Sequence, residues 1–200
     1  TWKRRRPPQR TPAPRFPHDK FMACYSAALR ADSRRTDADA RKAGPDAPRI
    51  ERGLQRRQRD AIEQVLRLWD GSPQLADDRW LAYMLAVVDH FSGAIPFREG
   101  GCLTEKCALR RLQQAGGEVT PASNGNHYYS RGLIQLKGAE SYRRVAEVTG
   151  EPIYDNPDLL LAPDVSARVL FAWMTDPRLS SHRSLDKFTA DGAFDLGQAL

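Results

Sequence analysis

The chain has 200 residues, of which 40% are hydrophobic and 28% are charged, and its formal net charge is +6 at pH 7. These values are ordinary for a globular domain and exclude a chain that is disordered throughout. No apolar run approaches the roughly 20 residues that a membrane-spanning helix needs, so we expect no membrane span.

The positive charge is concentrated near the N-terminus. Residues 1–60 contain 17 Lys and Arg against 7 Asp and Glu, whereas residues 61–200 contain 14 against 18. Residues 1–17 are rich in Pro and Arg and have no hydrophobic period, so we expect an extended basic arm. Two interpretations of this arm are open: it solubilises the chain, or it contacts an anionic polymer by counterion release.

Hydrophobic residues recur at helical spacing through most of the remaining chain, which predicts a mainly α fold. A helix over residues 18–30 precedes a polar loop over 31–49. Further helices are expected from residue 54 to the stop at 71–73, from 77 or 78 to about 90, around 105–115, over 140–148, and from 163 onward. We therefore divide the chain into the arm (1–17), an N-terminal helix and polar loop (18–53) and a helical domain (54–200).

The three cysteines are too few for a disulfide framework. Cys102 and Cys107 are five residues apart in the segment GCLTEKC. They either close a small loop in an oxidising compartment or remain free thiols. Cys24 has no obvious partner.

His90 ends a helix that is apolar on nearly every side, so we expect it to be a satisfied polar residue of the core. No second His or Cys lies at the spacing of a zinc site. The sequence therefore predicts no metal and no cofactor.

Several segments, in order, resemble glycoside hydrolase family 19, the chitinases and related phage endolysins. They are residues 79–86 (RWLAYMLA), 98–100 (REG), 128–138 (YYSRGLIQLKG) and 156–160 (NPDLL). The resemblance covers about residues 54–176 and implies a lysozyme-like helical domain. It also implies a cell-wall polysaccharide as partner, and an extracellular, periplasmic, or phage- or secretion-associated setting.

The resemblance fails at the position of the catalytic acid. Members of this family are inverting hydrolases that use one carboxylic acid to protonate the leaving oxygen and one carboxylate to activate water. Phe91 stands where the acid Glu is expected, and a phenyl ring transfers no proton. Glu99 aligns with the second carboxylate, and it is either a surviving base or a surface carboxylate paired with Arg98 or Arg131.

The loop after Phe91 is two residues shorter than the resemblance implies. This shortening favours a Phe91 ring that has joined the core, in which case Phe91→Glu would be destabilising. Asp89 is a weak candidate for a substitute acid. Adjacent helix positions point about 100° apart, so the Asp89 side chain should face away from that of His90. Glu105 and Glu118 are weaker candidates.

The resemblance implies substrate contacts for a further set of residues: Tyr128, Tyr129, Arg131, Gln135 and Tyr142. For Gln135 and Tyr142, a bond to the backbone and a place in the core are equally open. We also expect Arg131 to hold loops together through a carboxylate.

Three functions are compatible with these residues. The first is a degenerate chitinase- or endolysin-like domain that binds peptidoglycan, a chitin-type polymer or a protein partner with little or no hydrolysis. The second is an active inverting hydrolase of peptidoglycan or chitin with Glu99 as base. The third is a nucleic-acid or assembly protein that acts through the basic arm.

Overall fold

The computed structural model describes residues 16–28, 55–75 and 77–179. Within this part the fold is mainly α, as the sequence predicts. Residues 18–28 are helical, and the α-helices that follow are α2 (Arg56–Asp70), α3 (Asp78–Ser92), α4 (Glu105–Gln114), α5 (Ala139–Thr149) and α6 (Pro163–Thr175). Most of the arm, the whole polar loop over 31–49 and the C-terminal end lie outside the described residues, so the proposed division at 17 and 53 remains a prediction.

Two short strands and two 3-10 helices lie between the α-helices. Strand β1 (Phe97–Arg98) pairs antiparallel with β2 (Arg131–Gly132), so that Arg98 lies opposite Arg131. The 3-10 helix η1 (Glu99–Gly101) follows β1 directly, and η2 (Pro157–Leu161) precedes α6. Sequence periodicity did not reveal either strand, because two residues are too few for an alternating pattern.

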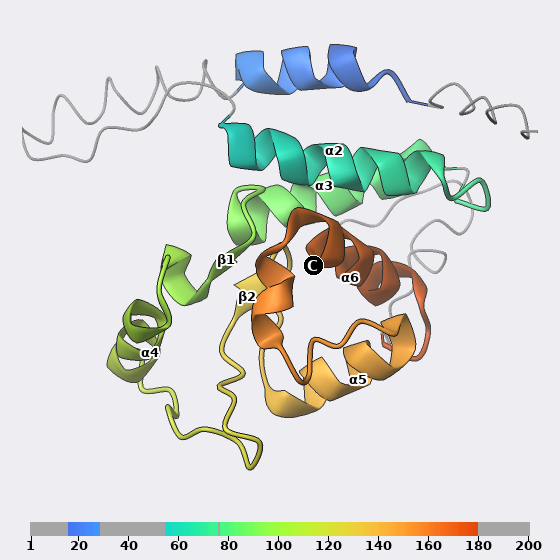
Figure 1. Ribbon diagram of the computed structural model, residues 1–200. Helices are drawn as coiled ribbons and strands as arrows, with labels where there is room; N and C mark the ends of the chain where they lie inside the picture. Colours follow the sequence, from blue (N-terminus) through green and yellow to red (C-terminus); the bar gives the residue numbers. More distant parts are fainter. Residues whose placement is uncertain (1–15, 29–54, 76, 180–200) are drawn as a thin grey trace, which may run out of the picture.

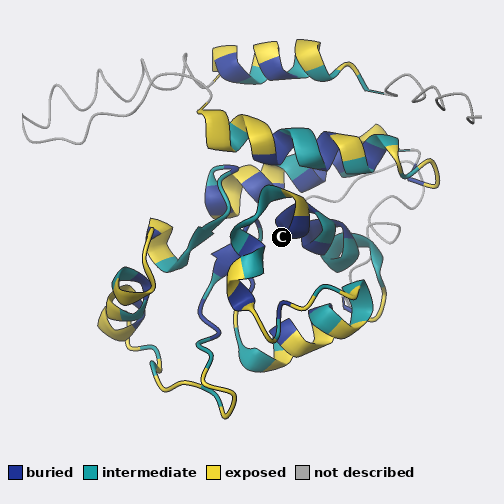
Figure 2. Cartoon of the chain, viewed as in Figure 1, coloured by how far each residue is buried: buried dark blue, intermediate teal, exposed yellow. Residues whose placement is uncertain are grey.

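The first core layer is formed by α2, α3 and α6, with the helix over residues 18–28 lying alongside α2 (Figure 1). One face of α2 is buried, and its Trp69 is fully covered. The opposite face is exposed, as Figure 2 shows. This division follows the helical spacing of the apolar residues in the sequence.

The ends of α3 are fixed by local sequence. The Asp77 carboxylate accepts a hydrogen bond from the backbone N–H of Arg79 at 3.0 Å, which satisfies one free donor at the helix start. Gly93 ends the helix in the left-handed conformation, with φ of 55°. The chain then turns through residues 93–96 into β1.

A second cluster of buried residues lies between α5, η2 and α6, and a third is formed by α4, Cys102 and Tyr129. The strand pair lies between these clusters (Figure 1). In the part of the chain that the structure describes, no helix has both the length and the apolar character of a membrane span.

Candidate functional site

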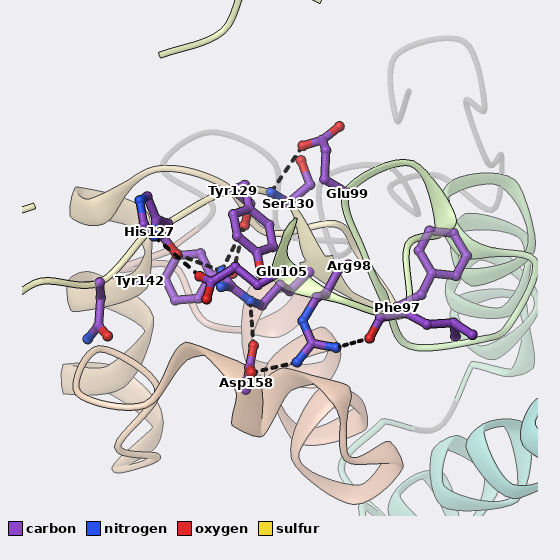
Figure 3. Close-up of polar contacts among 12 residues, drawn as sticks. Phe97, Arg98, Glu99, Glu105, His127, Tyr129, Ser130, Tyr142 and Asp158 are labelled. Carbon is purple, nitrogen blue, oxygen red and sulfur yellow. Dashed lines mark hydrogen bonds and ion pairs between the residues drawn. The ribbon is translucent and has the colours of Figure 1, made fainter. Parts of the chain in front are cut away.

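Asp158, at the start of η2, is the centre of the polar contacts around the strand pair (Figure 3). Its carboxylate accepts hydrogen bonds from Arg98 Nη2 at 2.6 Å and from Arg131 Nε at 2.9 Å. The two arginines come from facing positions of β1 and β2. One carboxylate therefore ties both strands to η2, over sequence separations of 60 and 27 residues.

Arg131 is buried, with 2% of its surface exposed. Besides Asp158, its guanidinium donates to the carbonyl oxygens of His127 and Tyr129 and to the hydroxyl of Tyr142, at 2.8, 3.3 and 3.3 Å. It also lies 3.6 Å above the centre of the Tyr129 ring. This arrangement is stabilising because the Nε and Nη1 donors of the buried guanidinium have acceptors in place of water. Arg131 thus holds loops together through a carboxylate, and that carboxylate is Asp158.

Glu99 lies directly after β1, and its Oε2 accepts a hydrogen bond from the backbone N–H of Ser130 at 3.2 Å (Figure 3). The alternative that Glu99 pairs with Arg98 or Arg131 is wrong, because both arginines bind Asp158. Glu99 is partly exposed. The structure therefore leaves a carboxylate at the surface beside the strand pair, oriented by a single backbone donor.

The three tyrosines that the resemblance places at the substrate are buried. Tyr128 is 9% exposed, Tyr129 is 1% exposed and Tyr142 is fully covered. The Tyr142 hydroxyl donates to the Tyr129 carbonyl at 3.0 Å, and the Tyr128 hydroxyl donates to the Tyr154 carbonyl at 2.7 Å. Burial raises the pKa of Tyr142 and of Tyr129 above the ordinary value of 10.0, so both phenols remain protonated. The Tyr142 hydroxyl thus holds the backbone next to Ser130, whereas the Tyr128 hydroxyl holds the backbone at Tyr154.

Gln135 ties the turn after β2 to β1. Its Nε2 donates to the carbonyl oxygens of Gly132 and Phe97, at 2.8 and 3.2 Å. Its backbone is in the left-handed region, with φ of 52°. Of the two roles left open by the sequence, bonding to the backbone is present in the structure.

The end of α3 differs from expectation at two residues. Phe91 is 50% exposed, so the prediction that its ring has joined the core is wrong. His90 is also exposed, and it is not the buried polar residue we expected. The two rings contact each other edge to face, with centroids 5.2 Å apart. Met84 and Val88 on the same helix are fully buried, and Ser92 in the last turn is 3% exposed, so the exposure is confined to one side of this turn.

Cys102 and Cys107 form a disulfide that joins the end of η1 to α4. The loop that it closes contains Leu103, whose carbonyl accepts from Arg98 Nη1 at 2.7 Å. The disulfide therefore supports Arg98, which is one of the two arginines on Asp158. Cys24 is an exposed free thiol.

Each of the carboxylates considered as a substitute acid, apart from Glu118, has a polar partner. Asp89 accepts a hydrogen bond from the Tyr25 hydroxyl, and Glu105 lies 3.2 Å from His127 Nδ1. Burial and the Asp89 carboxylate raise the pKa of Tyr25. Within the described ranges, no group of three or more His, Cys, Asp or Glu residues is arranged to hold a metal ion.

Comparison with known proteins gives one partial relative. Over 91 residues the chain is 32% identical to Endochitinase A2 of Pisum sativum. This part of the chain is chitinase-like. The match covers 44% of this chain and 28% of the pea protein, so the chain spans little more than a quarter of its relative's length. No family model and no solved structure matches the chain.

Asp158 is the residue at the centre of these contacts that the sequence did not single out. The segment NPDLL was used only as a marker of the chitinase resemblance. The available signal was a charged residue, Asp158, between Pro157 and two leucines at the start of a short helix. Its partners lie on other elements, so no local pattern named them.

Proposed function

We propose that this chitinase-like domain binds a β-1,4-linked amino-sugar chain, of the chitin or peptidoglycan type, and hydrolyses it little or not at all. The proposal rests on partial identity to an endochitinase together with the exposed Phe91 at the position where the resemblance expects the acid. A phenyl group has no proton to give to a leaving oxygen. The protein would then be a degenerate member of glycoside hydrolase family 19.

Within this proposal, the observation that carries the loss of hydrolysis is that the carboxylates other than Glu99 have partners. Both oxygens of Asp158 accept from arginines, Glu105 is next to His127, and Asp89 bonds Tyr25. Each of these carboxylates thus has a structural partner in the described part of the chain. Glu99 alone does not supply both the acid and the base that an inverting reaction needs.

The binding face that we propose consists of Glu99, the backbone at Ser130 and the partly exposed Gln135. Arg131 and Tyr142 are buried behind this face. Their side chains hold the backbone carbonyls of His127 and Tyr129 in place. Because Gln135 Nε2 donates to backbone carbonyls, the Gln135 amide oxygen and the Glu99 carboxylate act as acceptors for sugar hydroxyl and N-acetyl N–H groups. In this arrangement the buried residues position the face rather than contact the sugar.

The test is a pelleting assay with insoluble chitin and with purified peptidoglycan sacculi, compared over the same hours with sugar release. We expect the wild-type protein to pellet with one of the two polymers and to release no more soluble sugar than a heat-treated sample. Loss of a general acid removes a factor of about 10²–10⁴ in rate, which takes the release below detection. Robust release that Glu99→Gln abolishes would instead establish the active-hydrolase alternative.

A further inference from the structure

We infer that the exposed ring of Phe91 is a stacking platform for one pyranose ring of the bound glycan. This inference rests on the proposed function and names the aromatic contact within it. Phe91, which stands where the resemblance expects the acid Glu, then contributes to glycan binding.

The exposure of Phe91 is unusual for its place on the helix. It lies seven residues after Met84, which is close to two helical turns, so the two side chains leave α3 in nearly the same direction. Met84 is fully buried whereas Phe91 is 50% exposed. Phe91 therefore points in nearly the direction of the buried Met84 but is itself uncovered, although Ser92 beside it is 3% exposed.

The three tyrosines to which the resemblance assigned substrate contacts are buried. Tyr129 and Tyr142 are at most 1% exposed, and Tyr128 is 9% exposed. Among the described residues, the exposed large hydrophobic side chains are Phe91 and Leu103. Sugar rings pack the apolar C–H face of the pyranose on an aromatic face, for which the flat ring of Phe91 is suited and the branched Leu103 is not.

The turn between Phe91 and Glu99 is well held. The Gly93 carbonyl accepts from Gln58 Nε2 at 2.8 Å, the Ala94 N–H donates to the Val88 carbonyl at 3.2 Å, and Ala94 is 1% exposed. Figure 1 shows that the end of α3 leads through this short turn into β1. The platform and the carboxylate are thus carried by one constrained segment. His90 contacts the Phe91 ring edge to face, which limits the motion of the ring.

The experiment is calorimetric titration of wild type, Phe91→Ala, Phe91→Trp and Leu103→Ala with chitotetraose and with a peptidoglycan tetrasaccharide. We expect Phe91→Ala to raise the Kd of the bound sugar about tenfold, which corresponds to 1.4 kcal/mol. Phe91→Trp is expected to bind at least as tightly as wild type, because the larger ring keeps the face. Leu103→Ala is the matched control and is expected to stay within about twofold of wild type.

The outcomes separate the inference from the proposed function. Wild type that binds neither sugar overturns both. Wild type that binds while Phe91→Ala binds equally well, or while Leu103→Ala loses as much affinity, overturns the platform and leaves the function standing. Should Phe91→Ala fail to fold, NMR of the saturated wild-type complex decides: contacts between Phe91 ring protons and sugar C–H protons support the platform, and their absence overturns it.

Discussion

Arg131→Met is expected to lower the free energy of unfolding by about 3 kcal/mol, near the lower end of the cost of breaking a buried ion pair. The substitution removes one partner of Asp158 and leaves the carbonyls of His127 and Tyr129 without that donor. Each buried acceptor left unpaired costs about 1–3 kcal/mol. Asp158 keeps Arg98 and is half-exposed, which limits the loss.

Chemical unfolding monitored by circular dichroism measures this change. Arg143→Met is the matched control, because Arg143 pairs with Glu140 on the exposed side of α5. Exposed pairs contribute about 0–1 kcal/mol, so this variant is expected to unfold close to wild type. Equal stability of the two variants would mean that the Arg131 contacts do not hold the strand pair together.

Gly132→Ala is expected to destabilise the fold by about 3 kcal/mol, from left-handed strain and overpacking together. Gly132 has φ of 81°, and an added Cβ would lie 2.7 Å from Ser166 Oγ and 3.1 Å from the Leu160 carbonyl. Ser166 Oγ already accepts the Leu133 N–H at 2.7 Å. The methyl group would therefore separate β2 from η2 and α6.

Gly116→Ala separates the two causes. Gly116 also has positive φ, at 75°, but an added Cβ would meet nothing within 4 Å. We expect a loss of about 1 kcal/mol from backbone strain alone. The thermal midpoints of the two variants measure the difference, and a Gly116→Ala midpoint as low as that of Gly132→Ala would show that close packing at Gly132 contributes nothing.

The helices were predictable from sequence because their apolar residues repeat at helical spacing and their ends carry clear signals. Asp77 and Gly93 delimit α3, and Pro163 begins α6. The same periodicity misplaced Phe91. It shows which face of a helix is turned inward, but it does not show whether another element covers each residue of that face.

The polar contacts of the site were less predictable. The sequence offered Arg98 and Arg131 as possible ion-pair partners of Glu99, whereas both bind Asp158. The choice between two carboxylates depends on how β1, β2 and η2 meet in space. Separations of 27 and 60 residues leave no trace in local sequence pattern.

The most direct test of the account is an NMR titration of the wild-type protein with chitohexaose and with a peptidoglycan hexasaccharide, followed by mass spectrometry of the sugar in the same tube. The account predicts saturable shifts of the Ser130 amide, which donates to Glu99, with one of the sugars. It also predicts that this sugar is recovered at full length after a day. An unmoved Ser130 amide with both sugars would contradict the proposed binding face, and shorter oligosaccharides would contradict the loss of hydrolysis.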